Sequence, residues 1–338
     1  MKFSVILPAF NAENTIRKTL LSLIGQTHQN FEVIIIDDGS TDNTRLICEE
    51  FTSSDNRFVY IFQPNSGVSK ARNNGIEHAN GDYLAFIDSD DAYHPDYLSE
   101  FVRLIDGNPE CDNFWCEYNT IISTETTQSY LNEHTDNTVR YSNRKQIMTL
   151  HSNVLDAALW NKVFKIDIVK NNRIKMPEHI SLGEDLIFNF RFLDHTRDKI
   201  AIINKPLYNY TKSVDGSLDS KYHDNLKEIY DYIDSELLFY LKKWDISDEQ
   251  MVLFYNSVLF AQERILNNTF RPQSKLSYFQ KIKYNKSILK SCKFKEALLK
   301  SNCDIHPAYK FAYRIASWHL IKFLNYFSRI KKIFKDKL

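Results

Sequence analysis

Four short apolar runs alternate with helical patterns over the first hundred residues. The runs are rich in β-branched and aromatic residues, as is typical of buried strands: Phe3–Leu7, Phe31–Ile36, Val59–Phe62 and Tyr83–Ile87. Between them, apolar residues recur at helical spacing. A strict alternation of strand and helix predicts parallel strands joined by crossover helices. We therefore expect an α/β fold with a doubly wound, mainly parallel sheet flanked by helices.

The later part of the chain has a different pattern. Two strand-like runs, Asn113–Ile122 and Lys199–Tyr210, lie in the middle of the sequence. After about Ser217 the apolar residues keep helical spacing over long segments. We expect a sheet-containing domain at residues 1–216 and a mainly helical C-terminal region at residues 217–338.

Composition narrows the class of protein. Apolar residues make up 43 % of the chain and charged residues 25 %, as in ordinary globular proteins. The five cysteines are odd in number and form no C-x-x-C pair, which favours neither a disulfide framework nor a zinc site. No apolar run reaches the length of about eighteen residues that spans a membrane. The first apolar run is broken by Pro8, which argues against a signal peptide, so we expect a cytoplasmic protein.

The net charge of the chain is zero, but its C-terminal tail is basic. Residues 310–338 carry eight Lys or Arg against one acid, Asp336, and the rest of the chain carries a net charge of −7. The apolar residues of this tail fall on one helical face: Ala312, Ile315, Ala316, Phe323, Phe327, Ile330 and Phe334. A basic amphipathic helix can lie on an anionic membrane. We expect peripheral membrane contact through residues 310–338; the alternative is a helix packed on the protein's own core.

Acidic residues follow two of the predicted strands, where doubly wound sheets bind their ligands. In Asp88-Ser89-Asp90-Asp91, carboxylates two residues apart suit a hard divalent cation such as Mg²⁺ or Mn²⁺. The alternative is a solvated acidic turn before the next helix. In the segment Asp37-Asp38-Gly39-Ser40-Thr41-Asp42, a turn followed by a helix cap accounts for the later residues. It does not account for the two adjacent acids, Asp37 and Asp38, at the end of the strand. A carboxylate there could accept the imide N–H of a uracil ring.

Two further segments open helices. Gly67–Gly75 contains Arg72, and a helix start with an arginine suits a diphosphate or a nucleotide. The alternative is an ordinary amphipathic helix against the sheet. Glu184 and Asp185 follow Gly183 at the start of another helix, where the helix dipole alone favours acids. The dipole should also lower the pKa of Asp185, and adjacent helical residues point about 100° apart, so we expect only one of the two acids to face the site.

The order and spacing of these segments resemble glycosyltransferase family two, whose members have the GT-A fold. The segments that carry the resemblance are S-V-I-L-P-A-F-N, I-I-I-D-D-G-S-T-D, N-S-G-V-S-K-A-R-N-N-G, G-D-Y-L-A-F-I-D-S-D-D and G-E-D. The match is dense over residues 1–100. It continues thinly through W-N-K-V-F-K (Trp160–Lys165) and P-L-Y-N-Y (Pro206–Tyr210), and ends near residue 220.

The resemblance implies a wall for the nucleobase. Phe10 stands where the family usually has Tyr, so an aromatic face would stack on the base, and Pro8 and Asn11 would shape the wall around it. Asp38 would bind the uracil imide, and Asn65 would lie along the base.

The resemblance also implies sites for the diphosphate and for a metal. Arg72 would lie along the diphosphate. Asp88-Ser89-Asp90 is similar to the family's D-x-D, with Asp88 near the ribose and, with Asp90, on the metal, which would be Mn²⁺ or Mg²⁺. Lys212 stands where related enzymes carry a basic residue towards the donor phosphates.

The resemblance implies an inverting sugar transfer. Asp185 matches the acid that serves as general base, with Glu184 as its neighbour. The expected partners are a UDP-sugar donor and a saccharide or lipid-linked saccharide acceptor in cell-surface polysaccharide or glycolipid synthesis, and no nucleic acid; a homo-oligomer is left open. Two alternatives stay open: a nucleotidyltransferase, whose usual Gly- and Arg-rich loop is absent here, and a non-catalytic nucleotide-sugar-binding protein.

Overall fold

The computed structural model describes residues 1–122, 125–127, 138–153, 155–212 and 222–303. The chain forms two compact units. Met1–Asp219 and Glu236–Ile246 make up the first unit, and Ser220–Ser235 and Ser247–Leu338 make up the second. This division differs from the single boundary predicted near residue 216, because the later segment Glu236–Ile246 also belongs to the first unit.

The first unit is built on one sheet, in which the described residues contribute ten strands. Along the sheet the strands run β3 (Phe58–Phe62), β2 (Phe31–Asp37), β1 (Phe3–Ala9), β4 (Tyr83–Phe86), β9 (Lys162–Lys165), β6 (Asn113–Ile122), β10 (Ile200–Lys212) and β5 (Ala92–Tyr93). β7 (Glu125–Thr127) pairs with β6, and β8 (Val139–Ser142) pairs with β10. The first four strands are parallel, as is the β6–β10 pair, so the predicted mainly parallel α/β sheet is confirmed.

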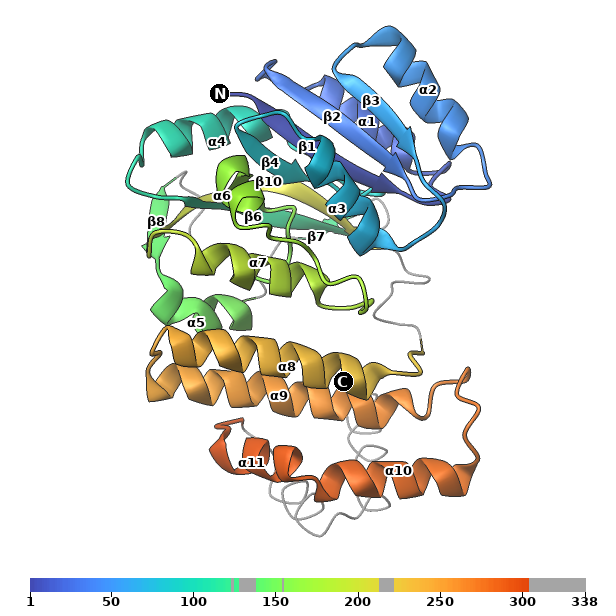
Figure 1. Cartoon of the computed structure of the whole chain (residues 1–338), viewed down its shortest axis with the longest axis vertical. Coiled ribbons are helices and arrows are strands. Elements are labelled where there is room, and N and C mark those ends of the chain that lie inside the picture. Colours follow the sequence, from blue (N-terminus) through green and yellow to red (C-terminus); the bar gives the residue numbers. More distant parts are fainter. Residues whose placement is uncertain (123–124, 128–137, 154, 213–221, 304–338) are drawn as a thin grey trace, which may run out of the picture. The chain divides into compact units, whose positions relative to one another are not determined.

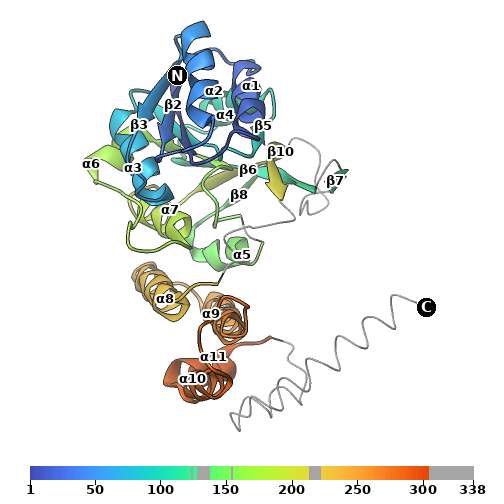
Figure 2. The same cartoon turned by 90° about the vertical axis from the view of Figure 1, so that its right-hand side faces the viewer.

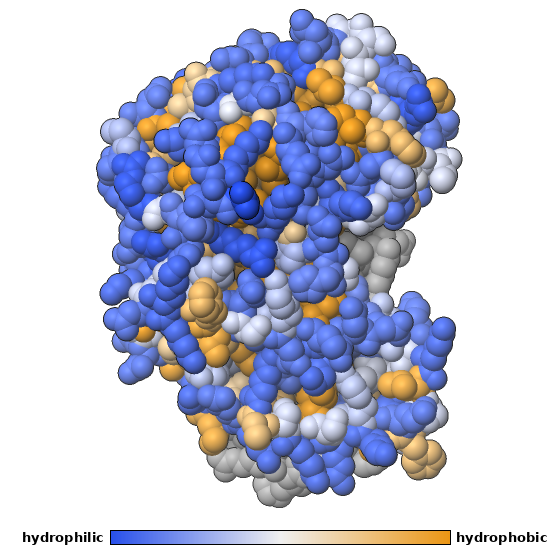
Figure 3. All heavy atoms as spheres, viewed as in Figure 1, coloured by the Kyte–Doolittle hydropathy of each residue, from blue (hydrophilic) through white to orange (hydrophobic). Residues whose placement is uncertain are grey.

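Helices flank this sheet (Figure 1). They are α1 (Ile16–Ile24), α2 (Thr44–Ser54), α3 (Val68–His78), α4 (Tyr97–Asp106), α5 (Ile147–Ser152), α6 (Ile166–Asn171) and α7 (Glu184–Asp194), with a short 3-10 turn at Arg144–Gln146. α3, α6 and α7 share one buried apolar cluster with β1, β2, β4 and β9. On the face shown in Figure 3, hydrophobic residues reach the surface in small groups among hydrophilic ones.

Close packing fixes the positions of α3 and α7, the two helices that carry residues of the site. A Cβ atom at Gly75 would lie 2.5 Å from Cγ2 of Ile6, so α3 approaches β1 more closely than any larger residue allows. Phe164 of β9 contacts Phe188 and Phe192 of α7 edge-on, with ring centroids 5.3 Å and 5.0 Å apart. These contacts fix α7 against the sheet.

β9 was not predicted as a strand. It lies antiparallel between β4 and β6, so the doubly wound order is interrupted after β4. The strand has four residues, too few for a periodic pattern to identify it in the sequence. Its position in the sheet depends on pairing partners that are distant along the chain.

The second unit is helical where it is described, which confirms the predicted helical C-terminal region. It holds the first part of α8 (Leu226–Lys243), then α9 (Asp248–Asn268), α10 (Tyr278–Lys290) and α11 (Cys292–Lys300), and α9, α10 and α11 pack together (Figures 1 and 2). Serine side chains cap all three: Ser247, Ser277 and Ser291. The tail at residues 310–338 lies outside the described residues. Among those described, we find no helix with the length and apolar character needed to cross a bilayer.

Candidate active site

The predicted site residues gather at the carboxyl ends of the parallel strands β1, β2, β3 and β4, where such sheets bind ligands. Pro8 is buried in β1, opposite Ile36 of β2. Phe10 follows β1, and half of its side chain is exposed (50 %), so its ring face is open to a ligand. Asn11 has a left-handed backbone (φ 48°), which Asn tolerates better than most residues. Its Oδ1 accepts from the backbone N–H of Thr41 at 2.9 Å, which joins the loops after β1 and β2.

Asp38 joins the loops after β2 and β3. Its buried carboxylate accepts hydrogen bonds from Gln63 Nε2 and from the backbone N–H groups of Ser66 and Gly67, each at 2.8 Å. Asn65 is exposed between these donors. A carboxylate offers about four acceptor positions, so three internal bonds leave about one for a ligand N–H. The proposed contact with a uracil imide stays a prediction, and it is compatible with this geometry.

A glycine makes this loop arrangement feasible. Gly39 has a left-handed φ of +81°, and a Cβ atom there would lie 2.7 Å from the backbone nitrogen of Asn65. Asp37, the other acid of the pair, is fully buried and accepts from the Tyr60 hydroxyl at 2.6 Å and from the backbone N–H of Ser40 at 2.8 Å. Its carboxylate therefore has a structural role.

Arg72 of α3 connects three carboxylates. The guanidinium is buried and donates to Asp88 at 2.8 Å, to Asp185 at 2.6 Å and to Glu184 at 3.3 Å. Burial alone would lower the pKa of Arg72, but the charges of Asp185, Asp88 and Glu184 outweigh it and raise that pKa. One cation faces three acids, so the cluster carries excess negative charge. Nε of Arg72 is buried and has no acceptor among the described residues.

The structure corrects two expectations about the start of α7. Both Glu184 and Asp185 reach the same nitrogen, Nη1 of Arg72, so the expectation that only one of them faces the site is wrong. Burial, together with the charges of Glu184 and Asp88, raises the pKa of Asp185 while Arg72 and Lys162 lower it, and the net result is a pKa of about 8. The expected lowering by the helix start is therefore wrong, because loss of water outweighs the dipole.

The carboxylates of the acidic loop after β4 lie in two different environments. Asp91 is fully buried and accepts from the Tyr208 hydroxyl and the backbone N–H of Thr211, both at 2.6 Å. Asp88 and Ser89 are partly buried, whereas Asp90 is exposed. Partial desolvation, followed by the charge of Asp88, nevertheless raises the pKa of Asp90. Burial and the charges of Asp88 and Asp90 raise the pKa of Asp91 well above its usual range.

This loop fits a divalent cation that arrives with a phosphate ligand. Among the described residues no group of three His, Cys, Asp or Glu side chains forms a ready-made metal site. Mg²⁺ and similar ions bind through one or two carboxylates and complete their shell with phosphate oxygens and water. Asp88 and Asp90 would supply those carboxylates, and a bound cation would offset the charge of Asp88, which together with the larger effect of desolvation raises the pKa of Asp90.

Lys212 ends β10 beside the acidic loop. The backbone N–H of its neighbour Thr211 donates to Asp91, and Lys18 Nζ lies 3.4 Å from the Thr211 hydroxyl. The Lys212 side chain is exposed and its ammonium has no ion-pair partner in the part of the chain that the structure describes. It is therefore free to approach a ligand phosphate.

The sequence pattern does not indicate a role for three residues that lie buried beneath the site. The indole of Trp160 stacks on Tyr208 with ring centroids 4.2 Å apart. Lys162 is buried, and its ammonium donates to the carbonyls of Leu155 and Ala158 at 2.5 Å and 2.6 Å. Burial lowers the pKa of Lys162 to about 7. The motifs W-N-K-V-F-K and P-L-Y-N-Y contained these residues, but nothing in the motifs indicated which side chains meet.

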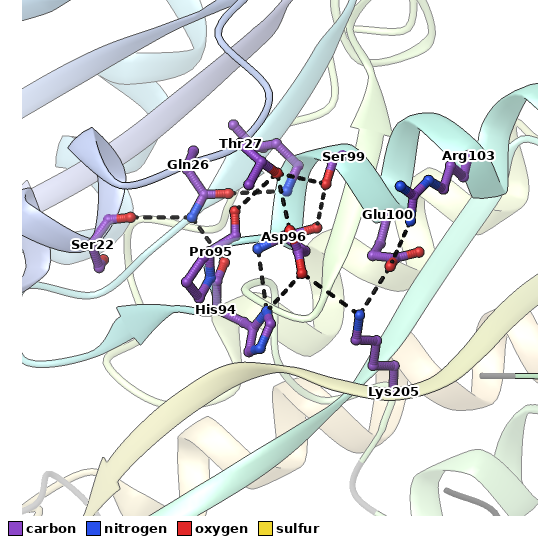
Figure 4. Close-up of polar contacts among 11 residues, drawn as sticks. Ser22, Gln26, Thr27, His94, Pro95, Asp96, Ser99, Glu100, Arg103 and Lys205 are labelled. Atoms are coloured by element: carbon purple, nitrogen blue, oxygen red, sulfur yellow. Dashed lines mark hydrogen bonds and ion pairs between the residues drawn. The ribbon is translucent and has the colours of Figure 1, made fainter. Parts of the chain in front are cut away.

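A polar network secures the chain just after the acidic loop (Figure 4). Gln26 Nε2 donates to the carbonyl of His94 at 2.9 Å, and the Thr27 hydroxyl lies 3.1 Å from Asp96. Lys205 of β10 pairs with Glu100 of α4 at 2.9 Å. The network therefore ties the end of α1, the start of α4 and β10 together around the segment that carries the acids.

Comparison with known proteins identifies relatives for part of the chain. A family model described as glycosyl transferase family 2 matches residues 4–171. Glycosyltransferase GlyA of Streptococcus pneumoniae serotype 4 is 34% identical over 216 residues, which cover 62% of this chain and 30% of that protein. The putative glycosyltransferase EpsH of Bacillus subtilis is 32% identical over 219 residues, which cover 61% of this chain and 60% of that protein. The match thus spans less than two thirds of the length of either relative.

The crystal structure of Staphylococcus aureus TarS 1–349 in complex with UDP-GlcNAc has a TM-score of 0.66 with this protein and 21% sequence identity. The superposition covers 95% of this chain and 89% of that one. Similarity at this level concerns the fold, and it confirms the expected GT-A architecture. The family model matched over residues 4–171 identifies this part of the chain as a glycosyl transferase family 2 domain.

Proposed function

We propose that the protein is an inverting, metal-dependent glycosyltransferase that transfers a sugar from a UDP-sugar to an acceptor hydroxyl. The observation that carries the proposal is the cluster in which Arg72 holds Asp88 and Asp185 at the carboxyl end of the sheet. In this cluster Arg72 would bind a phosphate between Asp88, which suits a metal, and Asp185, which suits proton transfer. The glycosyl transferase family 2 domain at residues 4–171 supports the same class of reaction.

The donor nucleotide would lie along the loops after β1, β2 and β3. The half-exposed ring of Phe10 offers a stacking surface, and the remaining acceptor position of Asp38 suits an imide N–H. The complex of S. aureus TarS with UDP-GlcNAc supports a uridine nucleotide as the ligand of this fold. Which sugar the donor carries is not part of the proposal.

The diphosphate would be held by Arg72, Lys212 and a cation on Asp88 and Asp90. The ion pair of Arg72 with Asp88, one of the two carboxylates that would hold the cation, supports this role. Mn²⁺ or Mg²⁺, when bound, would neutralise the charge that grows on the leaving diphosphate. Lys212, which is exposed and has no ion-pair partner among the described residues, adds a positive charge at the same edge.

Asp185 would act as the general base. As the acceptor oxygen attacks the anomeric carbon, its proton passes to a carboxylate oxygen of Asp185, and the bond from that carbon to the diphosphate oxygen breaks. A single displacement inverts the anomeric configuration. A base with a pKa near the working pH is effective, so the raised pKa of Asp185 supports this role. Glu184, also on Arg72, is the competing candidate.

The acceptor would be a saccharide or a lipid-linked saccharide in cell-surface polysaccharide or glycolipid synthesis, with the enzyme in the cytoplasm or peripheral on the inner face of the membrane. S. aureus TarS, a poly(ribitol-phosphate) beta-N-acetylglucosaminyltransferase that is 28% identical to this chain over 235 residues, supports a polymeric acceptor.

A panel of UDP-sugars tests the proposal directly. UDP release should require one particular UDP-sugar and a divalent cation, and the product should have the opposite anomeric configuration to the donor by NMR. A nucleotide-binding protein without activity would bind UDP and release none from any donor. A nucleotidyltransferase would release pyrophosphate from a nucleoside triphosphate.

A further inference from the structure

Helix α10 carries a row of lysines on one face. Phe279, Lys283, Lys286 and Lys290 follow one another at spacings of four, three and four residues, which places them on one side of a helix. We call these four residues the α10 stripe. The buried residues of α10 lie on the opposite side: Asn285, Ile288 and Leu289. The three lysines are exposed, and the stripe extends about 16 Å along a straight helix.

The positive charge of this region is compensated only in part, because Lys293 pairs with Asp231 at 2.7 Å and with Asp234 at 2.6 Å. Between Arg271 and Lys300 the chain has nine Lys or Arg and one acid, Glu296, and that acid pairs with Lys300 at 2.8 Å. The stripe lysines have no ion-pair partner within the described residues. Like charges one turn apart on a helix repel each other, so the stripe lowers the stability of α10 unless an anion lies against it.

Phe279 distinguishes one kind of anionic partner from others. Its side chain is 84% exposed, the highest value among the exposed large hydrophobic residues of the described chain. Lysines alone suit any polyanion. An exposed aromatic ring in line with lysines suits a bilayer, where the ring enters the interface and the ammonium groups reach lipid phosphates. The chain's own C-terminal segment does not complement the stripe, because residues 304–338 carry eight Lys or Arg against two Asp.

From this arrangement we infer that the α10 stripe is a docking surface for an anionic phospholipid membrane. The inference goes beyond the proposed transfer reaction and does not depend on it, because no residue of the stripe belongs to the candidate active site. It is also separate from the expectation for residues 310–338, which rests on sequence alone.

Vesicle binding of the full-length chain tests the inference. The chain should bind vesicles of phosphatidylcholine and phosphatidylglycerol in equal parts, and bind weakly to phosphatidylcholine alone. Each lysine near an anionic surface contributes about fivefold in binding, so Lys283→Gln/Lys290→Gln should lower the partition coefficient roughly 25-fold. The charge-preserving Lys283→Arg/Lys290→Arg should bind like the unmodified chain.

Two lysines of the first unit provide a matched control. Lys145 and Lys242 are exposed and have no ion-pair partner among the described residues, so Lys145→Gln/Lys242→Gln removes the same charge elsewhere. This control should change the partition coefficient less than about twofold. Circular dichroism should show equal helix content in all variants. Equal losses in the control and the stripe variant, or no loss in the stripe variant, would overturn the inference.

A second measurement separates a membrane from an anionic polymer. In a Phe279→Trp variant, phosphatidylcholine brominated in its acyl chains should quench the added fluorescence, measured as the difference from the unmodified chain with its four tryptophans. Long-chain polyphosphate should compete weakly with vesicles. Tight binding to polyphosphate without quenching by brominated lipid would instead identify a soluble polyanion as the partner, and the inference would be wrong.

Discussion

The loops after β2 and β4 both place acids at the end of a parallel strand, and they use them in opposite ways. After β2, Asp37 and Asp38 accept five hydrogen bonds from neighbouring loops and strands. After β4, Asp90 is exposed to solvent, and Asp88 forms an ion pair with Arg72. Acids that accept several hydrogen bonds within the protein hold the loops in place, although Asp38 keeps about one acceptor position for a ligand N–H. Acids that crowd one another without enough donors are the ones ready for a ligand.

The start of α7 belongs to the second class and gives the strongest prediction. Asp185→Asn should lower kcat by about 10²–10⁴ and leave UDP-sugar affinity within a few-fold, because the amide cannot take the acceptor's proton. Single-turnover kinetics with the preferred donor would measure it. Glu184→Gln is the matched control, since Glu184 contacts the same nitrogen of Arg72. An active Asp185→Asn with an inactive Glu184→Gln would assign the base to Glu184.

Asp90→Ala should lower transfer about 10³-fold, the scale expected when a metal loses a ligand that stabilises the leaving group. EDTA should abolish transfer, and Mn²⁺ or Mg²⁺ should restore it. The melting temperature should stay the same or rise, because the substitution removes a charge that crowds Asp88 and Asp91. Full transfer in EDTA, or a variant that unfolds, would contradict the distinction between the two loops.

The pH dependence of kcat/KM should report Asp185 in the free enzyme. Its raised pKa of about 8 means that the carboxylate is mostly protonated below that pH and cannot act as a base. We expect kcat/KM to rise about tenfold per pH unit up to about pH 8 and then level off. The residual kcat/KM of Asp185→Asn should not show this rise with pH. A flat profile between pH 5 and 8 in the unmodified enzyme would mean that Asp185 titrates in its ordinary range.

Asp38→Ala should act on stability as well as on binding. It leaves Gln63 Nε2 and two backbone N–H groups without their acceptor, which costs about 1–3 kcal/mol of unfolding free energy per buried group left unsatisfied. Calorimetry should also show that the variant loses most of the preference for UDP over ADP and GDP. A lower melting temperature with unchanged preference would leave Asp38 a purely structural residue, like Asp37.

The local pattern of apolar residues was sufficient to predict much of the fold. The four parallel strands, the helices between them, β6 and the helical C-terminal region were all predicted from the spacing of apolar residues, which reflects which side of each element is buried. The strand pattern placed Asp38 and Asp88 at one edge of the sheet, because parallel strands end at the same edge, and the family resemblance added Arg72 and Asp185. Their individual roles there remain predictions for the experiments above.

The tertiary structure alone decided how these residues interact. Arg72 meets Glu184 and Asp185 across 112 and 113 positions of sequence, and Asp91 meets Tyr208 across 117. Local periodicity does not encode such pairs. β9 likewise became a strand because β4 and β6 offer it backbone partners. The direction of the pKa shift of Asp185 follows from the same cause: a helix start lowers the pKa of an acid that stays in water, and packing at the junction with Arg72 removed most of that water.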